Sequence, residues 1–263
     1  MSSRIEILND GGFRSDGRLP SELRSLAFDL TPQAGADGSA MVSHGLTQVL
    51  VSVFGPREAK NRAQTMHNRA ALNVEVSVAP FSTSSDRRRR GRGDKRVQEI
   101  VAMIKSTFEP VVQTTLYPRS QIDIFVHVLQ QDGGVLQASI NATTLALTAA
   151  GVPLLDLVCA ITAGVHSTSP DSPLLDLTTL EENDCPSVTV AVMPRSGKLT
   201  LVSLETRVHV DVFKGILEVV GEAGKVLSLE MKRAVLARTK MLKDAMGAGL
   251  RTAEFAEDAG GDE

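Results

Sequence analysis

The spacing of apolar residues along the first half of the chain changes between that of a strand and that of a helix. Three stretches either alternate apolar and polar positions, as half-buried strands do, or consist mainly of apolar residues, as buried strands do. They are residues 48–54, 71–78 and 121–129. Between the last two, the spacing i, i+3, i+4, i+7 of one helical face is carried by Val97, Ile100, Val101 and Ile104. This spacing predicts a helix over residues 94–108, and a second helix is predicted over 138–150.

The second half of the chain repeats this mixture of spacings. Residues 159–165 are predicted to form a strand, and 188–192 with 198–203 a hairpin around an Arg-Ser-Gly turn. Helical spacing then runs from residue 212 to about 246, with a break suggested at the glycines 221 and 224. Strands and helices in both halves predict an α/β (α+β) fold with mixed sheets packed on helices.

Composition narrows the class of protein. The 263 residues are 42% hydrophobic and 22% charged, as is usual for a globular protein. No run approaches the roughly 18 apolar residues of a membrane span, and no secretory leader is expected at the start. Two cysteines make a disulfide framework or a cysteine-based zinc site unexpected, and the five histidines show no metal motif, so neither metal nor cofactor is predicted.

Charge is distributed unevenly around a net value of −3. Residues 86–96 hold six arginines and one lysine against two aspartates, and residues 55–69 form a second basic loop. Each could be a solvated loop, but together they favour a positive channel that neutralises phosphates without reading sequence. The last 13 residues, 251–263, hold five acidic residues against one arginine and are predicted to form a disordered acidic tail.

A glycine pair stands between the strand at 121–129 and the helix that follows it. In QQDGGVLQAS, residues 130–139, Gly133 and Gly134 could offer free backbone N–H groups to an anion. The next two residues are Val135 and Leu136, which give an anion no polar partner. Farther on, residues 174–190 carry four carboxylates that suit a divalent cation or acid–base chemistry, although a solvated turn is the simpler interpretation.

Several stretches together resemble one family. They are FRSDGRLPSELR (13–24), GLTQVLVSVFGPRE (45–58), DKRVQEI (94–100) and LYPRSQIDIFVHVLQQDGG (116–134). In this order they are similar to the ring subunits of the RNA exosome, which belong to the ribonuclease PH family. The resemblance covers about residues 11–245. It implies the ribonuclease PH fold, with two βαβ-type halves and assembly into a hexameric ring around a pore. We expect an extension at 1–10, one ribonuclease PH-like domain at 11–250 and the tail at 251–263.

The resemblance also implies what the glycine turn and the acidic loop do. Active relatives read DGGTR at the turn, where Thr and Arg bind phosphate; Val135 and Leu136 stand there in this chain. Active relatives then read about DLxxxED, with a second Asp six positions after the first catalytic one. Aligning DLTTLEEN places Asn183 in the first slot and Thr189 in the second, unless a local shift brings in Asp184. We therefore expect a degenerate site without catalytic residues, formed by Gly133, Gly134, Val135, Leu136, Asn183, Asp184 and Thr189.

The basic residues fit the RNA path of the family. The residues expected to bind RNA are Lys60, Arg62, Arg87, Arg88, Arg89, Arg90, Arg92, Lys95 and Arg96. The resemblance predicts a non-catalytic ring subunit that guides single-stranded RNA 3′ ends to a hydrolytic 3′→5′ ribonuclease, beside other ring subunits and S1/KH caps. It also implies residence in nucleus, nucleolus and cytoplasm. The alternatives are a phosphate-dependent 3′→5′ exoribonuclease that releases nucleoside diphosphates and an unrelated α/β enzyme.

Overall fold

The computed structural model describes residues 7–9, 11–58, 66–83, 93–166 and 169–258. Seven of the nine residues expected to bind RNA (Lys60, Arg62, Arg87, Arg88, Arg89, Arg90 and Arg92) lie outside these described residues. Most of the predicted N-terminal extension lies outside them too. Within the described residues, no helix is long and apolar enough to cross a membrane.

The first sheet has five strands in the order β1-β2-β3-β5-β4. Its strands are β1 (Leu26–Leu30), β2 (Gly38–His44), β3 (Thr47–Glu58), β4 (Ala71–Val78) and β5 (Ser120–Gln130). β4 and β5 are parallel and are joined through helix α1 (Lys95–Phe108) and the short 3-10 turn η2 (Thr114–Leu116), whereas the other ladders are antiparallel. Asp94 caps α1 by accepting the backbone N–H of Arg96 at 3.1 Å. The first half therefore contains the expected βαβ unit.

The second sheet has four strands in the order β7-β6-β8-β9. Its strands are β6 (Cys159–His166), β7 (Ser169–Leu175), β8 (Ser187–Met193) and β9 (Lys198–Leu204). All three ladders are antiparallel, so β7 and β8, which flank β6 and both pair with it, run parallel to each other. The expected βαβ connection of this half is therefore the link from β7 to β8, whereas the links β6–β7 and β8–β9 are too short for a parallel crossover. Helix α3 (Thr179–Asp184) joins β7 to β8.

Helix α2 (Val135–Ala149) packs between the two sheets, against β2 and β3 on one side and β6 on the other. Small residues permit this close packing: a Cβ on Gly38 of β2 would lie 2.5 Å from the carbonyl oxygen of Ala146. Asn141 lies in the middle of α2, is fully buried, and bonds both the N–H and the carbonyl of Ala160 in β6. The main buried cluster includes residues of both sheets and of α1, α2 and α4, and a smaller second cluster is formed by Ile7, Leu174, Leu177 and Cys185.

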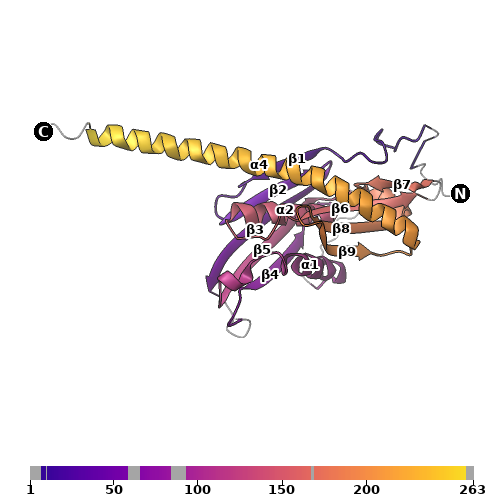
Figure 1. Cartoon of the computed structure of the whole chain (residues 1–263), viewed down its shortest axis with the longest axis horizontal. Helices are drawn as coiled ribbons and strands as arrows, with labels where there is room; N and C mark the ends of the chain where they lie inside the picture. The colour runs from indigo at the N-terminus through magenta and orange to yellow at the C-terminus, as the bar shows by residue number, and fades with distance from the viewer. Residues whose placement is uncertain (1–6, 10, 59–65, 84–92, 167–168, 259–263) are drawn as a thin grey trace.

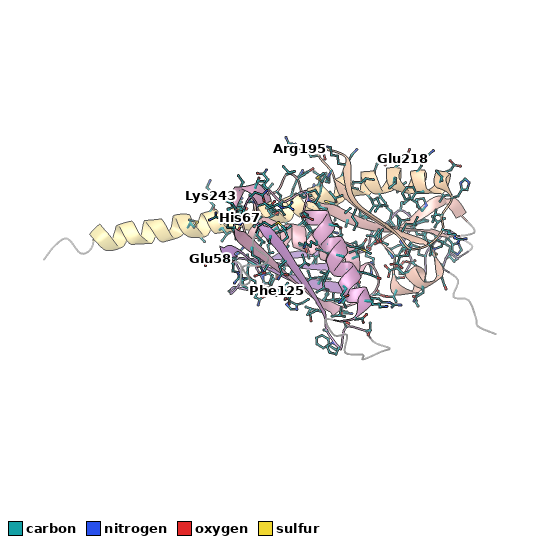
Figure 2. The ribbon with its side chains drawn as sticks, turned by 90° about the horizontal axis from the view of Figure 1, so that it is seen from below. Glu58, His67, Phe125, Arg195, Glu218 and Lys243 are labelled. Carbon is teal, nitrogen blue, oxygen red and sulfur yellow. The ribbon has the colours of Figure 1, made fainter. Side chains whose placement is uncertain are left out.

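Helix α4 (Val210–Asp258) runs for 49 residues without the break suggested at Gly221 and Gly224. Two helical glycines cost about 1 kcal/mol each relative to alanine, but burial of Ile216, Val220, Leu227 and Met231 holds the helix together across them. α4 follows the sheets and then projects beyond them (Figure 1). Glu218 lies on the half that follows the body and Lys243 near the point where the helix leaves it (Figure 2). The helical backbone includes residues 251–258 of the predicted disordered tail.

Candidate functional site

The turn between β5 and α2 requires its two glycines. Gly133 and Gly134 have φ values of 77° and 63°, in the left-handed region that favours glycine. A Cβ on Gly133 would lie 2.5 Å from the carbonyl oxygen of Leu177, and one on Gly134 would lie 2.6 Å from Nε2 of Gln137. The turn is therefore packed against the chain that leads into α3, and Gly134 caps α2 without a side chain of its own.

A carboxylate from α3 lies at this turn. Oε1 of Glu182 accepts the backbone N–H of Gly134 at 2.7 Å, although the two residues are 48 positions apart. An anion at a helix N-terminus satisfies a free N–H and meets the positive end of the helix dipole. Burial raises the pKa of Glu182 above its usual value, and this outweighs the opposing effects of the Gly134 hydrogen bond and the Arg24 charge. The anion position that the sequence suggested is thus met by the protein's own carboxylate.

The structure places the residues expected at the acidic motif on α3 and β8. Asn183 and Asp184 are exposed on α3, whereas Glu182 on the same helix bonds the backbone N–H of Gly134. Counting DLxxxED from Asp176 puts its final acidic position on Glu182, the residue that does reach the turn. Thr189 lies on β8, where its hydroxyl is 3.0 Å from that of Thr162 on β6. Glu182, and not the expected Asn183, is therefore the α3 residue whose side chain bonds the glycine turn.

The two residues after the glycines form the first turn of α2. Val135 and Leu136 are half-buried and pack against the main core. Neither side chain carries a polar atom, so neither adds a hydrogen-bond donor or a charge to the turn. The anion cradle thus consists of backbone, with Glu182 at the amide of Gly134.

A buried ion pair supports the opposite, carbonyl side of the turn. Asp176, 1% exposed, accepts the backbone N–H of Arg24 at 2.9 Å, its Nη2 at 2.7 Å, and the amide of Gln137. Nη1 of Arg24 also donates to the carbonyl oxygen of Asp132 at 2.5 Å. Burial by itself raises the pKa of Asp176, but the hydrogen bonds and charge of Arg24 outweigh it and lower the pKa to about 2. Arg24 is therefore engaged within the protein and not directed at the amide side of the turn.

A second buried pair ties the N-terminal segment to α3. Nε of Arg14 donates to Oε1 of Glu181 at 2.8 Å, and Nη1 donates to the carbonyl oxygen of Leu175 at 2.5 Å. Burial by itself raises the pKa of Glu181, but the Arg14 hydrogen bonds and charge outweigh it and leave the pKa below its usual value. Two of the acidic-loop carboxylates are thus structural. In the described part of the chain, no three His, Cys, Asp or Glu side chains gather as metal ligands.

Two of the residues expected to bind RNA can be placed. Lys95 and Arg96 are both exposed on the first turn of α1. They are the last two residues of the arginine-rich segment 86–96 and directly follow the Asp94 cap. Their exposed cationic groups are accessible to a phosphate backbone.

The chain has two sheets with helix α2 between them, a glycine turn at the start of that helix and an acidic segment facing the turn. This arrangement is that of the ribonuclease PH class of fold. The family models agree: 3′ exoribonuclease family, domain 1, matches residues 22–153, and domain 2 of the same family matches residues 156–220. The chain belongs to this family. The predicted α/β class and the ribonuclease PH fold are thereby confirmed.

Individual relatives and solved structures show which members of the family this chain is similar to. The human protein named Exosome complex component RRP41 is 41% identical over 234 residues, which cover 88% of this chain and 94% of that protein. The Schizosaccharomyces pombe protein named Exosome complex component ski6 is 39% identical over 233 residues, 89% of this chain and 95% of that protein. The crystal structure of rice Rrp46 has a TM-score of 0.75 at 25% identity and covers 83% of this chain and 98% of its own. An Archaeoglobus fulgidus exosome chain, solved with RNA bound to the active site, shares the fold with a TM-score of 0.72 at 20% identity, over 84% of this chain and 93% of its own.

Proposed function

We propose that this chain is a non-catalytic structural subunit of an RNA exosome core ring. There it forms part of the channel that guides single-stranded RNA 3′ ends to an associated ribonuclease for processing and decay. The observation that carries the proposal is the turn at Gly133 and Gly134, where Glu182 already bonds the amide of Gly134. A phosphate ion at this amide would meet a like charge at hydrogen-bond distance, and the side chains of Val135 and Leu136 offer it no donor.

The resemblance to named exosome components supports the proposed partners. They are other ribonuclease PH-like ring subunits, S1/KH caps, a hydrolytic 3′→5′ ribonuclease and single-stranded RNA. Residence in the nucleus, nucleolus and cytoplasm belongs to the same proposal. The basic segments at 55–69 and 86–96 supply charge for tracking the RNA backbone without reading its sequence.

One observation favours a second candidate function, a phosphate-dependent 3′→5′ exoribonuclease. Glu182 keeps a carboxylate at the final acidic position of the family motif, and a carboxyl group there could serve acid–base chemistry. The two candidates differ in one product, because only the second releases nucleoside diphosphates when phosphate is present.

The RNA-guiding role is tested in the assembled ring by reversing the four arginines at 87–90 to glutamate. We expect weaker protection of single-stranded RNA from an added nuclease and a shallower dependence of binding on salt, because fewer counterions are released. The matched control is Arg195→Glu, which reverses an exposed arginine at the β8–β9 turn. Equal RNA protection by the wild type and the 87–90 variant would refute the role of this segment.

A further inference from the structure

A cleft of about 590 Å³ opens beside the glycine turn. It is lined by the start of β3, the end of β5 and the segment that follows β4, and Asp132 connects it to the turn. Its volume is within the range of small-ligand sites. Asp176, Glu181 and their arginine partners do not line the cleft, and Asp132 is the lining residue that contacts Arg24 of that network.

Backbone hydrogen bonds fix an aromatic ring at the rim of this cleft. The N–H of Ala79 donates to the carbonyl of Val128 at 3.0 Å, and that of Gln131 donates to the carbonyl of Ser82 at 2.9 Å. These bonds attach the segment after β4 to the end of β5 and place Phe81 between them. Phe81 is 68% exposed, more than any other phenylalanine whose side chain is described, and Leu46 in the same cleft is 61% exposed. Hydrogen bonds thus hold the backbone on either side of Phe81, and two large apolar side chains, Phe81 and Leu46, are exposed at the cleft.

The polar side chains of the cleft are mostly amides. Gln48 and Gln130 are partners across the β3–β5 ladder, and Gln131 follows them in the lining. Each carboxamide offers both donors and an acceptor, and within the described residues none of these three side-chain amide groups makes a hydrogen bond to the protein. The charged lining residue is Asp132, whose Oδ2 is 4.0 Å from Nη1 of Arg24. A carboxylate repels phosphate, so the cleft suits a neutral, flat group with polar edges.

We propose that this cleft binds one base of a single-stranded RNA, stacked on Phe81 and Leu46, with its edge at the three glutamines. Stacking on an aromatic ring tolerates every base, and amides that both donate and accept can pair with different base edges. The proposal rests on the proposed RNA-guiding function, because the ring is what delivers the strand. The arginine-rich segment 86–96 begins five residues after Phe81 in the sequence, so cations for the phosphates are nearby in the chain.

Tryptophan fluorescence tests the stacking directly, because the chain contains no tryptophan. Phe81→Trp in the full chain places a single reporter in the cleft. Leu155→Trp is the matched control, because Leu155 is 58% exposed and lines a separate cleft of about 340 Å³. We expect oligouridylate and oligoadenylate to quench the indole of the Phe81→Trp chain but not that of the Leu155→Trp chain. Inorganic polyphosphate, which has no base, should quench neither. RNA that binds the Phe81→Trp chain without quenching it, or equal quenching by polyphosphate, would overturn the proposal.

Affinity measurements in the assembled ring distinguish a loss of base stacking from a loss of folding in the Phe81 variants. Phe81→Ala should weaken binding of single-stranded RNA about 5- to 150-fold, the range for loss of one stacked base. Phe81→Tyr keeps the ring and should bind within about twofold of the wild type. If Phe81→Ala binds as the wild type does while reversal of the four arginines at 87–90 abolishes binding, the cleft assignment is wrong and the proposed function stands. A wild-type ring that binds no RNA would instead refute the proposed function.

A photo-crosslinking amino acid at position 81 distinguishes the base from a protein occupant. In the ring with radiolabelled RNA, we expect the crosslink to form with RNA. A crosslink to a neighbouring subunit, present without RNA and unchanged by it, would show that the cleft is a subunit contact and would overturn the proposal.

Discussion

Replacing Asp176 with asparagine isolates the contribution of one buried charge to the framework behind the glycine turn. Asp176 is 1% exposed and its counter-ion Arg24 is 7% exposed. The φ of Asp176 is 54°, a left-handed conformation that asparagine adopts readily, so the substitution adds little backbone strain. The asparagine side chain keeps the shape and one acceptor oxygen but removes the buried counter-ion of Arg24, which retains the more distant carboxylate of Asp132 at 4.0 Å.

Two separate arguments give the size of the change in the free energy of unfolding caused by Asp176→Asn. The pKa of Asp176 falls from 3.8 to about 2, and a shift of this size corresponds to about 2 kcal/mol of stability at neutral pH. Removing one partner of a buried ion pair costs about 3–5 kcal/mol in other proteins. We therefore expect Asp176→Asn to lower the free energy of unfolding at pH 7 by about 2–4 kcal/mol. For a chain of this length, the midpoint of thermal unfolding falls by about 4–16 °C.

Urea denaturation of the full chain at several pH values measures this difference. Because the folded-state pKa is depressed, the contribution of Asp176 is complete above about pH 4 and is lost as the pH falls through about 2. The difference between wild type and variant should therefore shrink to about half of its pH 7 value by pH 3. The matched control is Asp184→Asn, the same substitution at an exposed position of α3, which should change the free energy by less than about 0.5 kcal/mol. A difference that is equally large at pH 3 and pH 7 would refute the assignment to charge.

Burial and backbone geometry support three further predictions. Burial lowers the pKa of His44 from 6.5 to about 4, so the ring is neutral in the fold. Because the unfolded chain binds this proton more readily, the free energy of unfolding should fall by about 2 kcal/mol from pH 7 to pH 5. His44→Gln should remove most of this fall. Gly133→Ala should lower the free energy of unfolding, measured by urea denaturation, by at least about 2 kcal/mol more than Gly12→Ala does. Both glycines have a φ of 77°, but only at Gly133 would the added Cβ meet backbone atoms. Equal losses of stability in the two variants would contradict this. Burial raises the pKa of Glu182, so the ionised carboxylate weakens the fold as the pH rises above 4.5. The Glu182→Gln variant should therefore match or exceed the wild type in stability at pH 7. A clear loss of stability would show instead that the charge stabilises the turn.

Local pattern was sufficient to predict the elements whose spacing is regular. The alternation at 71–78 gave the bounds of β4, and the helical spacing over 94–108 gave α1, which begins one residue later because Asp94 is its cap. α2 begins at Val135, three residues before the predicted start, because Gly134 completes its turn in the left-handed region and the helix follows at once. β1 and β2 were missed, because short strands mixing small, polar and apolar residues give a weak alternation.

The site shows where local pattern fails. The glycine turn and its apolar followers are visible in ten residues of sequence, but the direction of Glu182 depends on α3, which the sequence suggested as an acidic loop. The pairs of Arg14 with Glu181 and of Arg24 with Asp176 join residues more than 150 positions apart. No periodicity within one element connects them, because each contact is set by the packing of the N-terminal segment against the second half of the chain.

The formation of nucleoside diphosphate by a ring that contains this chain tests the central claim most directly. The ring is assembled without the hydrolytic ribonuclease and incubated with single-stranded RNA and isotope-labelled phosphate. A second ring carries Glu182→Gln in this chain alone. If the chain is non-catalytic, neither ring will release labelled nucleoside diphosphate above the level without RNA. Labelled product from the wild-type ring that disappears in the Glu182→Gln ring would contradict the claim and assign phosphorolysis to this subunit.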